Sequence, residues 1–194
     1  FIIILFISHL TSAEVSLKKF SIEGISIGDS VANYFPGREI TKNIVKQAGL
    51  TDEFYVAHFN KHKSFSQFDQ IYFVINPSTE NVLFPIEGMS AFIDFKQDIE
   101  KCFKEKDSFF EQIINIYKQE INEKLIDINT AIKPHPSDLT GKSTYEQTDI
   151  KFPNGFIRIA CYDMQAHSGT NDALILDFFT EDVDRWLQNE SKKT

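Results

Sequence analysis

The hydrophobic positions of the chain follow two kinds of pattern. Over 95–125, apolar residues recur every three or four positions, as on one face of an amphipathic helix. Elsewhere, short runs of β-branched and aromatic residues lie between turn signals, which is typical of strands. These runs cover 53–59, 70–76, 81–86, 148–152, 156–163 and 173–179. The pattern predicts one long helix and two groups of three antiparallel strands.

The long helix has one internal ambiguity. Ser108 and Glu111 have the spacing of a capping box. The run could therefore be two helices that break near Asp107. Shorter helical patterns cover 37–48 and 180–187, and Thr180 is a suitable cap for the second of them.

Both halves of the chain have the same predicted order, a helix followed by three strands. Neither a long linker nor a low-complexity tract separates the halves, and they show no residue-by-residue repeat. We therefore expect residues 14–194 to form a single α+β domain with one shared core. A long amphipathic helix packed across an antiparallel sheet would bury the helix stripe and one face of the sheet.

The first residues have the features of a signal peptide whose charged start is missing. Residues 1–10, FIIILFISHL, are mostly apolar, and the small residues Thr11 and Ala13 occupy the −3 and −1 positions before Glu14. About ten apolar residues are too few to span a membrane, which needs about 20. We expect residues 1–13 to be a truncated signal peptide and the protein to be periplasmic or secreted, without stable membrane insertion after cleavage. A buried first strand or a truncated anchor is the alternative.

Charge limits the classes of partner. The 194 residues include 20 Lys or Arg and 28 Asp or Glu, which gives a formal net charge of −8. Binding to nucleic acid depends on clustered basic residues that displace counterions. We therefore expect neither nucleic acid nor an anionic membrane surface as a partner. The hydrophobic share of 42% and the charged share of 25% are those of an ordinary globular protein.

The two cysteines both fall on apolar faces. Cys102 lies on the apolar stripe of the long helix, and Cys161 shares a strand face with Ile157 and Ile159. In an exported protein, two inward-pointing cysteines are more often joined than free. The sequence predicts a Cys102–Cys161 disulfide, and two buried thiols are the alternative.

Two short blocks resemble those of the SGNH/GDSL esterase family. GDS at 28–30 would supply the nucleophile Ser30, and GTND at 169–172 resembles the block whose Gly and Asn help to form the oxyanion hole. In that family a later Asp-x-x-His pair activates the serine, but here His167 precedes GTND and no His follows it. A serine without a base is a weak nucleophile. We therefore expect Ser30, or its neighbour Asp29, to be a helix cap and expect no catalytic residue.

Two further patterns are weak candidates for chemistry. GKS at 141–143 resembles the end of a phosphate-binding loop, but Pro136 stands where that loop has its first Gly, and it has no N–H to offer. His58 and His62 would share a helix face, yet their segment predicts a strand, in which they would lie about 13 Å apart. We expect neither a cofactor nor a metal site.

Over most of its length the chain resembles a group of uncharacterised exported proteins from AT-rich marine alphaproteobacteria of the Pelagibacter type. The resemblance rests on IEGISIGDS at 22–30, the helix with Cys102, KPHPSDLTGKS at 133–143 and CYD at 161–163. The group has no assigned activity, so the resemblance implies export and architecture but no catalytic residue. In element order the chain is also similar to small periplasmic α+β modules of the outer-membrane-assembly and β-lactamase-inhibitor type, which bind proteins through an open sheet face.

These features predict an exported, non-catalytic protein that acts as a binding or envelope-maintenance module. We expect its partner to be another envelope protein or a small ligand. Two alternatives stay open. One is an SGNH/GDSL-like esterase using Ser30, and the other is a small-ligand-binding protein in which some of the 19 Phe residues line a cavity.

Overall fold

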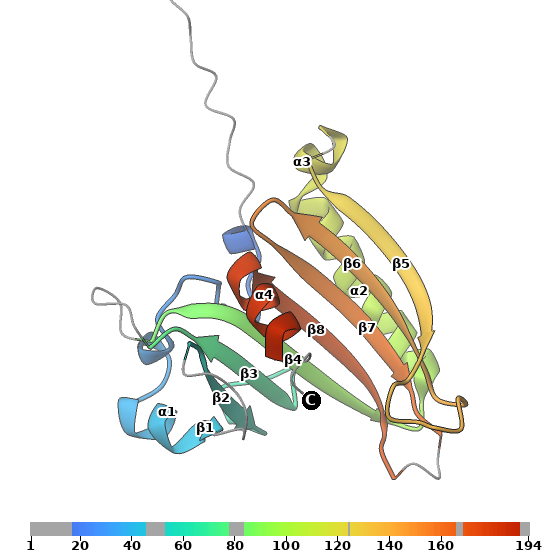
Figure 1. Ribbon diagram of the computed structural model, residues 1–194, viewed down its shortest axis with the longest axis horizontal. Helices are drawn as coiled ribbons and strands as arrows, with labels where there is room; N and C mark the ends of the chain where they lie inside the picture. The colour runs from blue at the N-terminus through green and yellow to red at the C-terminus, as the bar shows by residue number, and fades with distance from the viewer. Residues whose placement is uncertain (1–16, 46–52, 78–83, 124, 166–168, 191–194) are drawn as a thin grey trace, which may run out of the picture.

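An eight-stranded antiparallel sheet organises the molecule, with helices on both of its faces (Figure 1). The computed structural model describes residues 17–45, 53–77, 84–123, 125–165 and 169–190. The strands are β1 (Ile44–Val45), β2 (Tyr55–Asn60), β3 (Gln70–Ile75), β4 (Ile86–Lys96), β5 (Asp127–Pro134), β6 (Thr144–Phe152), β7 (Gly155–Asp163) and β8 (Asp172–Thr180). The helices are α1 (Gly37–Asn43), α2 (Ile99–Ile116), α3 (Lys118–Asn122) and α4 (Glu181–Glu190), with short 3-10 turns η1 (Leu17–Lys19) and η2 (Val31–Asn33). The predicted α+β class and antiparallel sheet are confirmed.

The two halves of the chain meet at the centre of the sheet. The strand order is β1-β2-β3-β4-β8-β7-β6-β5. β4, the last strand of the first half, therefore lies beside β8, the last strand of the second half. β4 and β8 pair antiparallel, with Gly88 opposite Phe179 and Asp94 opposite Ala173. Each half has four strands where the sequence predicted three, because β1 and β5 were not predicted.

The helix α2 covers one face of the sheet. It packs across β7, β8 and β4, and its Phe109 and Ile113 are buried there at helical spacing. From the sheet side, Leu174, Leu176 and Phe178 of β8 point into the same core. We call this the covered face. The prediction of a long amphipathic helix packed across the sheet is confirmed.

The helix α4 packs on the opposite face. Phe178 and Phe179 are neighbours on β8, so their side chains point to opposite sides of the sheet. Phe178 belongs to the core under α2, whereas Phe179 packs with Val183 and Trp186 of α4. Figure 1 shows α4 in front of the sheet and α2 behind it. Within the described ranges, no helix has the length and hydrophobicity needed to cross a bilayer.

Several predicted boundaries are wrong. The strand predicted at 81–86 has its last residue, Ile86, at the start of β4, while 81–83 lie outside the described residues. The helix is continuous through Asp107, so the alternative of a break there is wrong, and α2 ends instead before Tyr117. β5 escaped prediction because all but one of its residues are exposed, so no hydrophobic alternation marks it.

The turn between β6 and β7 is tighter than the three-residue hairpin loop that Pro153, Asn154 and Gly155 predict. Phe152 pairs with Gly155, so only Pro153 and Asn154 form the loop. Gly155 has a φ of 152°, and a Cβ atom there would lie 2.2 Å from the Phe179 carbonyl oxygen. Glycine is required at this position because β7 approaches the end of β8 too closely for a side chain.

Candidate binding surface

Ser30 is the N-cap of η2. Its hydroxyl accepts a hydrogen bond from the Ala32 backbone N–H at 3.2 Å. The neighbouring Asp29 accepts from the Ser26 N–H at 2.9 Å and from the Tyr34 hydroxyl at 2.7 Å, so it braces the preceding turn. The prediction that Ser30 is a helix cap is confirmed, and Asp29 is not the cap.

The two esterase-like blocks lie at opposite ends of β4. Ser30 forms a bridge to Pro85, directly before β4, whereas Asp172 of the GTND block pairs with Lys96 at the far end of that strand. β4 is 11 residues long, or about 33 Å at the usual rise. The glycine and asparagine of GTND therefore do not form an oxyanion hole around Ser30. His167 lies outside the described residues.

The two histidines considered as metal ligands have different partners. His58 Nε2 lies 3.1 Å from Gln70 Oε1 on the neighbouring strand. His62 Nε2 lies 2.9 Å from Glu39 Oε1 of α1. Within the described part of the chain, no group of three or more His, Cys, Asp or Glu side chains is placed to hold a metal ion.

The GKS segment belongs to the turn that leads into β6. The Asp138 carboxylate accepts hydrogen bonds from the backbone N–H groups of Thr140 and Ser143, at 2.8 and 2.7 Å. Hydrogen bonds from Thr140 and Ser143 lower the pKa of Asp138 below its ordinary value. The backbone N–H groups of Gly141, Lys142 and Ser143 thus all donate to acceptors within the turn itself.

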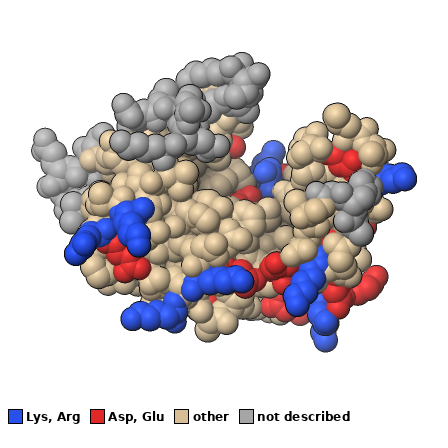
Figure 2. All heavy atoms as spheres, turned by 90° about the horizontal axis from the view of Figure 1, so that it is seen from below, with Lys and Arg blue, Asp and Glu red and all other residues tan. Residues whose placement is uncertain are grey.

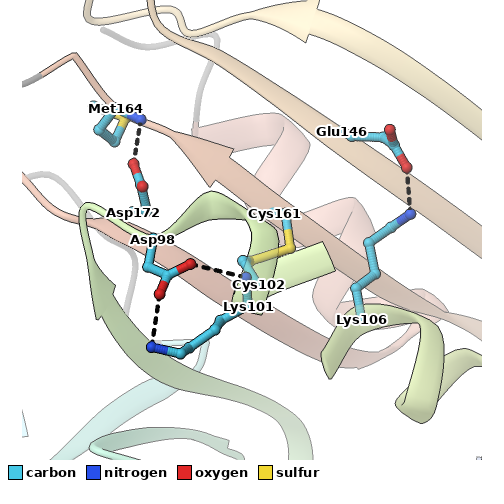
Figure 3. The surroundings of a disulfide bond; sticks show 8 residues. All are labelled: Asp98, Lys101, Cys102, Lys106, Glu146, Cys161, Met164 and Asp172. Carbon is cyan, nitrogen blue, oxygen red and sulfur yellow. Dashed lines mark hydrogen bonds and ion pairs between the residues drawn. A yellow bond between two sulfur atoms is a disulfide. The ribbon is translucent and has the colours of Figure 1, made fainter. Parts of the chain in front are cut away.

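Cys102 of α2 and Cys161 of β7 lie at disulfide distance, as the sequence predicted (Figure 3). Their Cα atoms are 5.9 Å apart, the two positions are 59 residues apart in sequence, and both side chains are fully buried. Asp98 begins the helix here, since its side chain accepts from the Lys101 N–H at 3.2 Å. The pair links the covering helix directly to the sheet.

A buried ion pair lies close to the cysteines on the covered face. Lys106 stands one helical turn after Cys102 on the apolar side of α2 and is only 5% exposed. Its Nζ lies 2.6 Å from Glu146 Oε1 of β6 (Figure 3). A buried charge is costly unless it is paired. The sequence analysis missed this pair, although a lysine in an otherwise apolar stripe was a signal for it.

Among the described residues, α4 alone packs on the sheet face opposite α2, and we call the part of this face beyond α4 the open face. Cross-strand pairing arranges its side chains in rows that run across the strands. The row under α4 is apolar. The next row, which we call the polar row, consists of His58, Tyr72, Ser90, Asp177, Arg158 and Asp149. The row after the polar row consists of Gln70, Phe92, Ile175, Ala160 and Gln147. The row after that one consists of Asp94, Ala173, Tyr162 and Tyr145.

A hydrogen-bonded network occupies the centre of the polar row. Asp177 accepts a hydrogen bond from the Ser90 hydroxyl. Burial raises the pKa of the Asp177 carboxyl to about 6, although the Ser90 hydrogen bond and the Arg158 charge both lower it. Arg158 Nε donates to Asp149 Oδ1 at 2.7 Å, and Gln147 donates to Asp149 Oδ2 at 2.8 Å. Charged and polar groups from four strands are therefore held in fixed positions.

Two aromatic clusters flank this network. On one side, the rings of His58 and Tyr72 are stacked with their centroids 4.1 Å apart. On the other side, Tyr145 stacks on Tyr162 at 5.1 Å, and the His135 ring packs edge-on against Tyr162 at 5.7 Å. All five side chains are half-buried, so each cluster presents both ring surface and polar atoms to solvent.

Figure 2 views the molecule from below, with the α4 side at the top, and shows acidic and basic side chains close together on the described surface. Sequence reasoning did not find the open face, because the residues of its polar row come from six strands. In β7 the signal was present, since Arg158 and Tyr162 alternate with the buried Ile157, Ile159 and Cys161.

A concave region lies beside α1. It is an open pocket of about 540 Å³, and its lining includes Arg38, Lys42, Asn60 and His62. Its lining also includes Phe59, whose ring packs on Phe35 in the core with the centroids 4.2 Å apart.

No family model, curated protein or solved structure matches this chain. Function is therefore inferred from the chemistry of the surface, since a fold by itself does not determine function.

Proposed function

We propose that the protein is an exported, non-catalytic module that binds a partner protein on its open face. The observation on which this rests is the polar row with its flanking aromatic clusters, on a sheet face that no helix of the described residues covers beyond α4. Tyr and Arg are enriched at the centres of protein interfaces. Side chains held by a sheet and by one another lose little freedom on binding, which favours affinity.

Both halves of the chain contribute to the proposed surface. The cluster of His58 and Tyr72 belongs to β2 and β3, whereas the cluster of Tyr145 and Tyr162 belongs to β6 and β7. We propose that the two halves of the chain share one core because the proposed binding surface forms only when the strands of both halves lie in one sheet.

Export is supported by the signal-like residues before Glu14 and by the paired cysteines, since disulfides persist in oxidising compartments. The protein expressed with a complete start in a bacterial host should appear outside the cytoplasm with Glu14 as its first residue. Intact mass measures this. A cytoplasmic protein that keeps residues 1–13 would contradict export.

Photo-crosslinking in the producing cell tests the binding surface. A benzoylphenylalanine in place of Tyr72 or of Tyr162 should crosslink to one and the same protein, identified by mass spectrometry. The matched control is Gln112, which is exposed on the outer side of α2, and a benzoylphenylalanine there should not capture that protein. Arg158→Ala, with an unchanged melting temperature, should reduce the adduct at both tyrosines.

Two outcomes would contradict this function. Equal capture of the protein from Gln112 and from the tyrosines would mean that the open face is not the site. The absence of an adduct at both tyrosines would favour a small ligand as the partner, with the pocket beside α1 as the place to look.

A further inference from the structure

The two edges of the sheet are unequal. β1 has two residues, whereas the opposite edge strand, β5, has eight. On the same side as α2, β5 carries Ile128 and Ile132, which are 40% and 70% exposed. Exposed β-branched apolar residues on a long edge strand favour pairing with another strand, and most proteins avoid them.

The hydrogen bonds of β5 show which of its backbone groups face outward. The N–H of His135, just past the strand, donates to the Ser143 carbonyl at 2.9 Å, so the odd-numbered positions of β5 face β6. Ile128, Thr130 and Ile132 therefore turn their N–H and C=O groups away from β6. Among the described residues no strand pairs with that side of β5. Pro134, which has no N–H, belongs to the same outward series, as expected at an edge.

The sequence of β5, DINTAIKP, is complementary to itself when two copies run antiparallel about Thr130. Thr130 then lies opposite Thr130 of the second copy, Ile128 opposite Ile132, and Asp127 opposite Lys133. The residues with outward backbone groups pair with one another in this register, so the N–H and C=O groups match. A register shifted by two residues places Ile128 opposite Thr130 and Asp127 opposite Ala131, and it loses both the apolar and the charged pairs.

We propose that a second copy of this chain pairs with β5, so that the two sheets join into one continuous sheet about a twofold axis at Thr130. The contact is isologous, because the same strand is used by both copies. The outward backbone groups and the isoleucine pairs supply the attraction, and the Asp127–Lys133 pairs determine the register. Asp127 and Lys133 form no ion pair with other described residues, so both are available. The open faces of the two copies point to the same side.

Sedimentation equilibrium of the purified, disulfide-bonded protein tests the proposal. The protein should show a monomer–dimer equilibrium. Asp127→Lys places like charges opposite each other at both ends of the contact, so it should weaken the dimer by about tenfold. Adding Lys133→Asp to that variant exchanges the charges and should restore the wild-type affinity. A protein that is monomeric at every concentration, or a charge exchange that fails to restore the dimer, would overturn the proposal.

A cysteine at the axis tests the register independently. Residue 130 faces its own counterpart in a hydrogen-bonded pair with Cα atoms about 5.5 Å apart, which is within the range of a disulfide. Under mild oxidation Thr130→Cys should give a crosslinked dimer on a non-reducing gel. The control is Ile132→Cys, on the same face of the same strand, because residue 132 lies about 13 Å from its counterpart. Equal crosslinking by the two variants would contradict the proposed register.

Discussion

The two faces of the sheet use alternate residues of the same strands for different purposes. Along β8, Leu174, Leu176 and Phe178 are fully buried under α2, whereas Ile175 and Asp177 are half-buried on the open face. The side chains change face at every residue. The buried core and the proposed binding surface are therefore separated by a single step along the chain, and a substitution on one face can leave the other face intact.

The faces also hold their charges differently. On the covered face, Lys106 and Glu146 form a pair shielded by α2. On the open face, the half-buried Arg158 bonds the buried Asp149 and interacts electrostatically with Asp177. Removing one member of a buried pair leaves an uncompensated charge. Burial raises the pKa of Asp177 on the open face to about 6, so that face is the one expected to respond to pH.

Loss of the disulfide should have the largest effect, because it loosens the covered face. Cys102→Ala combined with Cys161→Ala should lower the free energy of unfolding by about 4 kcal/mol, since the bond closes a loop spanning 59 positions. Urea unfolding compares this variant with oxidised and with reduced wild type, and the variant should match the reduced protein. Free thiols in the denatured, non-reduced wild type would show that the cysteines are not joined.

Removal of the α4 anchor should come next, on the other face. Trp186→Ala should cost about 3 kcal/mol, because Trp186 is 3% exposed and packs against Phe54 and Phe179. The control is Arg185→Ala on the same helix, whose ion pairs are exposed and should matter by less than about 1 kcal/mol. Similar denaturant midpoints for the two variants would mean that α4 is not part of the fold's stable core.

Asp177, on the open face, should make the free energy of unfolding depend on pH. Its pKa of about 6 lies above the value of about 3.9 expected in the unfolded chain. Between about pH 4 and pH 6, the Asp177 carboxyl is therefore protonated in the native state but ionised in the unfolded chain. The resulting stabilisation is complete below about pH 4 and disappears as the pH rises through about 6.

Asp177→Asn should remove this part of the dependence, so that the difference in unfolding free energy between variant and wild type changes over that interval. Urea unfolding at a series of pH values measures it. The control is Asp107→Asn, an exposed carboxylate on α2. Parallel curves for wild type and Asp177→Asn would contradict the prediction.

The smallest effect is expected at Ser30, at the end of β4. Ser30→Ala should lower the free energy of unfolding by about 1 kcal/mol, because it removes the cap of η2. The same proteins should show no turnover of short nitrophenyl esters. Turnover by wild type that disappears in a folded Ser30→Ala variant would instead support the esterase alternative.

Several features of this protein follow from the sequence alone because they depend on neighbours along the chain. The stripe containing Cys102 and Ile113 predicts α2, and Pro153 to Gly155 predicts the hairpin between β6 and β7. The inward faces of Cys102 and Cys161 predict their pairing. Periodicity, capping and turn chemistry act within a few residues, so they are visible before any tertiary contact is known.

Only the tertiary structure decided which surface is left open and which residues meet there. Tyr72, Asp177 and Arg158 lie far apart in sequence, and the polar row forms because β4 pairs with β8 and β8 with β7. The same pairing separates Ser30 from the GTND block by the length of β4. Strand register is a non-local property that each strand's own residues do not specify. It is set when all the strands share one buried face, since a slip of one residue would expose that face to water.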